Sequence, residues 1–251
     1  MRTRVRQYFL NAGPVCLVQH DVAPDAPSVV FITGLGTGMS EPRYLWSILA
    51  RELASQGINA VQYDHPGHGD SMVGDQPPLL DDLRTAAEAV VAHVPGPVHV
   101  VGYGIGAVLA AELTARGSVD SCVLVCPDTA TWATGAAHPA GRARVPPEAL
   151  AAHPTSRALV DAAVGEPYQP PQPAGAVVPD LLTASARAAA PAFSGLRGTH
   201  TTVVAVSEAD AAYARSMGLH CVRIDHEPTA AAPSWHWEHH PRAAVTDALA
   251  E

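Results

Sequence analysis

The stretch Val98-His99-Val100-Val101-Gly102-Tyr103-Gly104-Ile105-Gly106 decides the fold of this chain. Its apolar first half, residues 98–101, predicts a buried parallel strand, and residues 107–116 predict a helix. The three alternating glycines therefore lie on a sharp turn from a strand into a helix. The residue at the tip of this turn is Gly104.

The segments around this turn alternate between short apolar runs and longer helical patterns. Strands are predicted at residues 5–10, 15–19, 28–33, 58–63, 98–101, 121–126, 201–207 and 220–224. Helices are predicted at residues 42–56, 78–93, 107–116 and 241–251. The first two strands form a hairpin, and strands that alternate with helices favour a parallel sheet. We therefore expect an α/β fold with a mostly parallel eight-stranded sheet and helices on both faces.

The composition changes between residues 127 and 198, where alanine and proline dominate. Short helices are predicted within this stretch at residues 147–152, 156–164 and 180–190, while residues 167–179 contain too many prolines for a helix or an interior strand. We interpret residues 127–198 as an Ala/Pro-rich cap insertion, with a solvated surface excursion as the alternative. Residues 1–251 are expected to form a single domain.

Composition excludes several classes of function. The formal net charge is −9, and every one of the 15 Lys and Arg residues is arginine, so nucleic acid is not expected as a partner. Without lysine, neither a Schiff base nor a Gly-Lys-Ser/Thr phosphate loop can form. No apolar run is long enough to span a membrane. The four cysteines lie in apolar, strand-like segments without a metal-binding pattern, which favours reduced core thiols in a cytoplasmic protein.

Four segments in this order and spacing resemble the α/β-hydrolase fold over nearly the whole chain. Residues 33–36 (Thr-Gly-Leu-Gly) are similar to its oxyanion loop, although many members have His where Thr33 stands. Residues 64–71 are similar to its Asp-x-x-Gly-x-Gly-x-Ser turn, and residues 203–210 are similar to the strand and loop that carry the catalytic acid. Residues 102–106 match the Gly-x-Ser-x-Gly nucleophile turn except at its serine.

The resemblance implies a set of site residues. Gly104 would stand at the nucleophile position, and the backbone amides of Leu35 and Ile105 would form the oxyanion hole. The residues expected to line the substrate site are Gly34, Tyr103 and Cys126. We do not expect Cys126 or Tyr103 to replace the serine as nucleophile, because a buried cysteine is usually inert and the position of Tyr103 is variable.

The acid and the base that the resemblance requires each have alternatives. Asp210 is the preferred acid, and Asp128, which follows the preceding predicted strand, is its rival. The preferred base is His236, with His239 and then His226 as alternatives. Aligning Glu238 with the Glu-x-Pro pattern of the family leaves no histidine at the expected place, so His236 requires a longer loop.

The same segment also contains side chains of the types that bind metals. His236, Glu238, His239 and His240 are suitable ligand types, but a run within one loop needs further ligands, which His65 and His68 would have to supply. A polar stretch before the last helix is the commoner explanation. We therefore expect neither a metal nor another cofactor.

These observations lead to one preferred function and two alternatives. The preferred one is an enzyme without a serine nucleophile that acts on a small apolar carbonyl substrate. His236, oriented by Asp210, would be the general base, and the oxyanion hole would stabilise the negative charge. The reaction would be hydrolysis, elimination or cyclisation, and bacterial specialised metabolism is a setting that the resemblance suggests by analogy. One alternative is a pseudohydrolase that binds a small ligand or a protein partner. The other is an esterase or thioesterase inactivated by a Ser-to-Gly change. Oligomeric state does not follow from the sequence.

Overall fold

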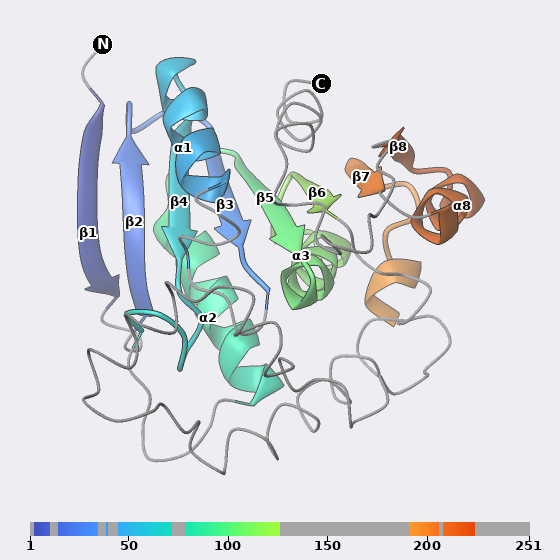
Figure 1. Cartoon of the computed structure of the whole chain (residues 1–251). Coiled ribbons are helices and arrows are strands. Elements are labelled where there is room, and N and C mark those ends of the chain that lie inside the picture. The colour runs from blue at the N-terminus through green and yellow to red at the C-terminus, as the bar shows by residue number, and fades with distance from the viewer. Residues whose placement is uncertain are drawn as a thin grey trace, which may run out of the picture.

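The computed structural model describes residues 3–10, 15–34, 39, 45–71, 79–125, 191–205 and 208–223. Eight strands form one sheet in the order β1-β2-β4-β3-β5-β6-β7-β8 (Figure 1). The strands are β1 (Arg4–Leu10), β2 (Val15–Asp21), β3 (Ser28–Ile32), β4 (Asn59–Tyr63), β5 (Val98–Tyr103), β6 (Ser121–Val125), β7 (Thr201–Ala205) and β8 (His220–Arg223). The β1–β2 and β2–β4 pairs are antiparallel and all other pairs are parallel, which confirms the predicted sheet.

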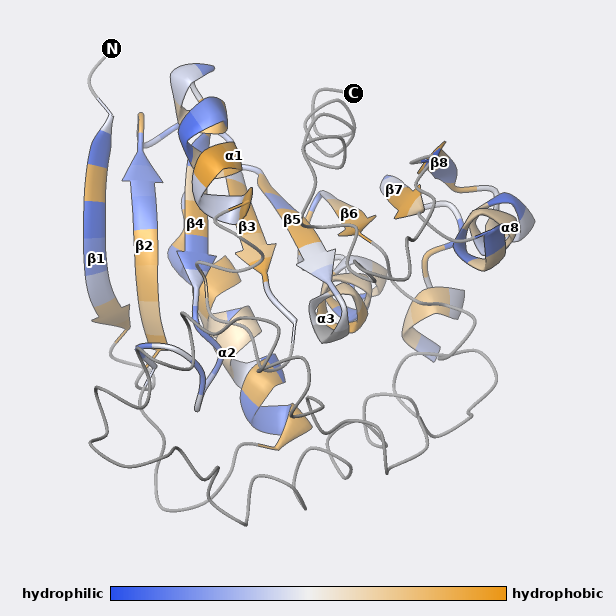
Figure 2. Ribbon diagram, in the orientation of Figure 1, coloured by the Kyte–Doolittle hydropathy of each residue, from blue (hydrophilic) through white to orange (hydrophobic). Residues whose placement is uncertain are grey.

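Adjacent residues of the central strands point to opposite faces of the sheet, and both faces are buried. In β3, Val30 and Ile32 pack in one apolar cluster with residues of α2 (Leu80–His93) and α3 (Ile105–Ala115). Val29 and Phe31 pack in a second cluster with α1 (Leu45–Ser55) on the other face. Helices therefore cover both faces, and in Figure 2 β3 is mostly hydrophobic in colour, whereas the edge strand β1 carries both hydrophilic and hydrophobic bands.

The apolar residues of α1 recur at the spacing of one helix face. Buried residues of this helix are Leu45, Trp46, Leu49, Ala50, Leu53 and Ala54. Trp46 stacks on Phe31 of β3 with ring centroids 5.2 Å apart. This contact holds α1 against β3, the strand that precedes the glycine-rich loop.

One prediction in the last third of the chain is wrong. Residues 203–210 were expected to be a strand followed by a loop, but helix α8 (Glu208–Met217) begins at Glu208 and includes Asp210 in its first turn. Acidic residues in the first turn and Arg215 in the last turn complement the helix dipole, and Arg215 also pairs with Glu208. Ala211 and Ala214 supply the apolar face that packs into the core.

Residues 191–199, at the predicted end of the insertion, pack against the main core. Phe193 and Leu196 are buried in the cluster that also holds α3, and the Phe193 carbonyl accepts a hydrogen bond of 2.7 Å from the Tyr213 hydroxyl. The predicted helices at residues 147–152, 156–164, 180–190 and 241–251 lie outside the described residues.

Two further expectations concern membranes and thiols. Among the described helices, none combines the length and hydrophobicity that a membrane crossing requires. Cys16 and Cys122 are buried free thiols, and Cys221 is a partly buried one. Burial raises the pKa of each of these three thiols, which keeps them protonated and unreactive at neutral pH.

Candidate active site

A sharp turn at Gly104 joins β5 to α3. The strand ends at Tyr103 and the helix begins at Ile105, so one residue makes the whole change of direction. Gly104 has a φ of +57° and a ψ of −122°, a conformation that glycine adopts at little cost and other residues adopt only under strain. This is the geometry expected of a turn that holds its tip residue out from the sheet.

The glycines on either side of the tip are required by backbone packing. A Cβ atom on Gly106 would lie well under 3.0 Å from the carbonyl oxygens of Ile32 and Thr33, and one on Gly102 would lie equally close to the carbonyl of Gly106. By contrast, the only described atom that a Cβ atom on Gly104 would meet is the Cα of Gly34, at an ordinary 3.6 Å. The turn is therefore packed tightly against the end of β3, while the described residues leave room for a side chain at its tip.

The described segment after β3 faces this tip. Thr33 and Gly34 are both buried, and Gly34 is the nearest described neighbour of the space beside Gly104. Gly34 thus lies beside the turn at residues 102–106, while Leu35 lies outside the described residues. Because β3 and β5 are adjacent parallel strands, both segments leave the sheet at the same edge.

A histidine that follows β4 also contacts this segment. Nε2 of His65 lies 2.9 Å from the carbonyl oxygen of Thr33, and the His65 side chain is completely buried. A carbonyl oxygen can only accept, so Nε2 carries the proton and Nδ1 is the unprotonated nitrogen. Burial lowers the pKa of His65 to about 4, with a smaller lowering by His68, so the ring is neutral at neutral pH.

The turn at residues 64–71 folds around the side chain of Asp64. Its carboxylate accepts hydrogen bonds from the backbone amides of Asp70, at 2.7 Å, and Met39. A Cβ atom on Gly69, which has a φ of +50°, would overlap this carboxylate. The Ser71 hydroxyl donates to the Asp64 carbonyl at 2.7 Å and accepts from the Cys16 amide at 2.8 Å. The polar residues of this turn thus hold it on β2 and on residue 39.

The hydroxyl of Thr33 has no hydrogen-bond partner among the described residues, although Thr33 is buried. Replacing Thr33 by the isosteric valine is therefore expected to raise the free energy of unfolding by about 1 kcal/mol, because an unsatisfied buried hydroxyl is removed. Urea titration measures the change. Thr114→Val is the matched control: its buried hydroxyl donates to Ala110 at 2.8 Å, and its loss should cost about 1 kcal/mol. Destabilisation by Thr33→Val would contradict this account.

The predicted acid, Asp210, is buried with 3% of its surface exposed. It follows β7, which runs parallel to β5 with β6 between them. Its carboxylate lies in the first turn of α8, where the positive end of the helix dipole favours negative charge. The sequence predicted that Asp210 lies in a loop, whereas it lies in the first turn of a helix.

Five predicted site residues lie in the described part of the chain: Gly34, Tyr103, Gly104, Ile105 and Asp210. Gly34 lies beside Gly104 where β3 and β5 end, and Ile105 is the first residue of α3. Tyr103 is partly buried and packs against the apolar cluster on the α1 face. The other predicted or alternative residues, Leu35, Cys126, Asp128, His226, His236 and His239, lie outside the described residues.

Sequence interpretation considered His65 only as a possible metal ligand and missed its contact with Thr33. Its place two residues after the predicted end of a strand was the one available signal, because polar residues there lie at the carboxyl ends of the parallel strands, where such sheets bind ligands. In the part of the chain that the structure describes, no three His, Cys, Asp or Glu side chains are arranged to hold a metal ion. His68 is turned toward its own backbone, with Nδ1 3.1 Å from the carbonyl of Pro66.

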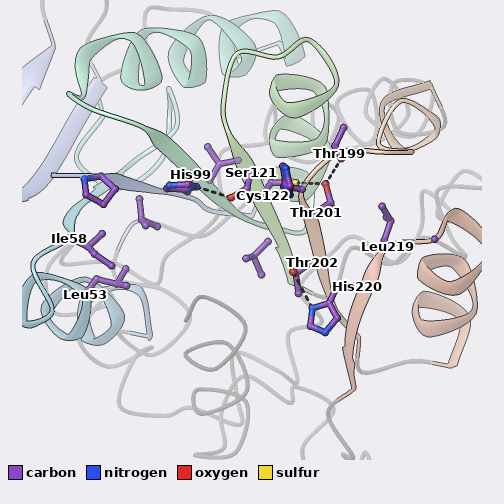
Figure 3. A pocket seen from close by; sticks show the side chains of 16 residues that line it. Leu53, Ile58, His99, Ser121, Cys122, Thr199, Thr201, Thr202, Leu219 and His220 are labelled. Carbon is purple, nitrogen blue, oxygen red and sulfur yellow. Dashed lines mark hydrogen bonds between the residues drawn. The ribbon is translucent and has the colours of Figure 1, made fainter. Parts of the chain in front are cut away.

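A separate cavity of about 600 Å³ opens at the amino ends of the parallel strands, opposite the end at which Gly104 lies (Figure 3). Its lining includes residues from the amino ends of β6, β7 and β8, such as Ser121, Thr201 and His220. His99 lies 2.7 Å from Ser121 through Nδ1 and Oγ. Ligands of open parallel sheets bind at the carboxyl ends of the strands, so this cavity is not the site formed around Gly104.

The chain is similar in sequence to one known protein family over most of its length. The sequence profile of the Alpha/beta hydrolase family matches residues 29–248. A pimeloyl-[acyl-carrier protein] methyl ester esterase from Methylococcus capsulatus is 38% identical over 104 residues, which are 40% of this chain. The match spans only 37% of the length of that curated relative.

Solved structures share the fold over nearly the whole chain. The thioesterase domain from the curacin biosynthetic pathway has a TM-score of 0.60 and 15% identity, with 100% of both chains covered. Est1E from Butyrivibrio proteoclasticus, solved with ferulic acid bound, has a TM-score of 0.61 and 15% identity, with 96% of both chains covered. At this identity the likeness concerns the fold.

Proposed function

Because this chain belongs to the Alpha/beta hydrolase family, we propose that it is a hydrolytic enzyme that cleaves a small apolar ester or thioester without a serine nucleophile. The observation that carries the proposal is the turn at Gly104, whose tip has a positive φ, faces Gly34 and has room for a side chain among the described residues. In this family fold such a turn presents the nucleophile, and glycine leaves that place open to a water molecule or a substrate atom.

Oxyanion stabilisation would come from backbone groups that do not depend on a serine side chain. The amide of Ile105 is at the first position of α3, where helix N–H groups have no partner within the helix and the dipole is positive. The amide of Leu35, in the loop that follows Gly34, is the second proposed donor. Two such donors stabilise the negative charge that develops on a carbonyl oxygen during acyl transfer.

The proposed base is His236, oriented by the buried carboxylate of Asp210. The imidazole would take a proton from water while the water oxygen attacks the carbonyl carbon and the carbonyl oxygen becomes an oxyanion. As the oxyanion collapses, the bond to the leaving oxygen or sulfur breaks, and the proton passes from His236 to the leaving group. The products are a carboxylic acid and an alcohol or thiol. The esterase relative supports hydrolysis over elimination or cyclisation.

The test is turnover of a panel of short-chain and medium-chain acyl esters and thioesters by the full chain. His236→Ala and Asp210→Asn are each expected to lower kcat/KM by about a hundredfold, the usual contribution of general-base catalysis. His200→Ala is the matched control, because His200 is exposed at the opposite edge of the sheet and should leave turnover unchanged. Unchanged turnover in both site variants would contradict the proposed base and acid.

A serine at position 104 separates this proposal from an inactivated esterase. In the proposed mechanism Gly104→Ser does not raise turnover, because the added hydroxymethyl group occupies the space of the attacking water. A rise of about tenfold or more, which corresponds to about 1.4 kcal/mol, would instead identify a serine esterase that lacks its nucleophile. No turnover of any panel member by the unsubstituted protein, together with saturable ligand binding, would identify a pseudohydrolase.

A further inference from the structure

We propose that His65 is a positioning residue that fixes the loop after β3 beside Gly104 by holding the carbonyl group of Thr33. The inference rests on the proposed function, because that loop is the proposed source of one oxyanion donor. His65 itself would touch neither substrate nor the reacting atoms. Its role would be to set the direction in which the backbone leaves the sheet after Thr33.

The hydrogen bond from His65 fixes an entire peptide unit. A peptide bond is planar and trans, so the carbonyl of Thr33 and the N–H group of Gly34 point in opposite directions. With the carbonyl oxygen held 2.9 Å from Nε2 of His65, the Gly34 N–H must point away from His65. If this peptide unit flipped, the Gly34 N–H would point toward His65 and the loop would leave β3 in a different direction.

The same carbonyl oxygen also lies against the nucleophile turn. A Cβ atom on Gly106 would lie 2.7 Å from the Thr33 carbonyl oxygen, which shows how closely the two backbones approach. Thr33 is thus held between α3 on one side and the His65 ring on the other. The hydrogen bond connects the segment after β4 with the two segments whose mutual position the proposed site requires.

Asp64, the residue before His65, binds Met39, which is the next described residue of this loop after Gly34. The Asp64 carboxylate accepts a hydrogen bond from the Met39 amide, while His65 donates to Thr33. Two consecutive side chains therefore attach residues 33 and 39 to the same turn. Residues 35–38 lie between these two attachments, outside the described part of the chain.

The surroundings of His65 suit a neutral donor rather than a base. Its ring packs edge-on against Tyr63, with centroids 5.2 Å apart, and lies 5.9 Å from the ring of His68. No described residue provides a partner for Nδ1, and burial holds the pKa near 4. The Nε2–H donor is therefore present at any pH at which a hydrolase of this fold would work, with no charge added beside the oxyanion site.

The test compares variants that keep or remove the donor. The amide nitrogen of glutamine occupies a place similar to that of Nε2, whereas methionine fills the space without donating and asparagine is too short to reach Thr33. His65→Met and His65→Asn are expected to lower kcat by about tenfold with KM changed less than about twofold. His65→Gln is expected to retain kcat within about threefold. If methionine prevents folding, asparagine supplies the same comparison.

A second readout does not depend on turnover. In the Met and Asn variants, hydrogen exchange at the Gly34 amide should become about tenfold faster, and glutamine should restore it. Equal kcat in His65→Met and His65→Gln, with both proteins folded and active, would overturn the inference, as would unchanged Gly34 exchange. If the unsubstituted protein turns over no substrate, the proposed function fails, and the exchange experiment still decides whether His65 fixes the loop.

Discussion

Alanine at position 106 is expected to lower the free energy of unfolding by at least about 3 kcal/mol, because its Cβ atom would overlap backbone atoms rather than a movable side chain. Helix propensity alone would predict the opposite sign for this change in the free energy of unfolding. Gly106 lies within α3, where alanine is intrinsically about 1 kcal/mol better than glycine. The carbonyl groups of Ile32 and Thr33 belong to the end of β3, so relief of the overlap would push α3 off the sheet.

Gly104→Ala is the matched variant in the same turn. Among the described residues its Cβ atom meets only the Cα of Gly34, at 3.6 Å, so the expected cost is the strain of a positive φ, about 1 to 2 kcal/mol. Urea or thermal unfolding of the two variants gives the comparison. A Gly106→Ala protein as stable as Gly104→Ala would contradict the described packing of the turn against β3.

Acid is expected to destabilise the protein through His65. Its pKa is about 4 in the folded state because of burial, against an ordinary 6.5. The unfolded chain therefore binds a proton more readily, and stability falls as pH falls. The contribution is fully present above pH 6.5 and is lost progressively as the pH falls toward about 4, for a total of about 3 kcal/mol. Protonation would also place an N–H donor at buried Nδ1, which has no partner among the described residues.

The measurement is the difference in unfolding free energy between the unsubstituted protein and His65→Gln over that pH range. Glutamine does not titrate, so the difference isolates His65 from groups present in both proteins, including His20, whose pKa burial also lowers. The stability advantage of the histidine protein should shrink steadily below pH 6.5. Parallel stability curves for the two proteins would show that His65 is not held neutral by burial.

Most of the sheet could be predicted because its strands are short apolar runs buried on both faces. The strand predicted at residues 28–33 ends one residue earlier, at Ile32. β5 extends two residues further than predicted because Gly102 and Tyr103 still pair with Leu124 and Val125 of β6. α3 starts two residues early because the turn needs only Gly104.

Helix α8 was missed because the interpretation of residues 203–210 followed the expected strand and loop rather than the local pattern. Its alanines at positions 211 and 214 have helical spacing, and its end charges have the signs that a helix favours. The contact of His65 with Thr33 could not be predicted in this way. It joins residues 32 positions apart, and its energetic role depends on burial that only the folded chain supplies.

The central claim is that residue 104 occupies the nucleophile position of the family fold beside the proposed oxyanion donors. Its most direct test is treatment of Gly104→Ser and of the unsubstituted protein with a fluorophosphonate probe, followed by intact-mass and peptide analysis. The account predicts one adduct, on the introduced serine, and none on the unsubstituted protein. A folded serine variant that stays unlabelled, or labelling of the unsubstituted protein at any residue, would contradict it.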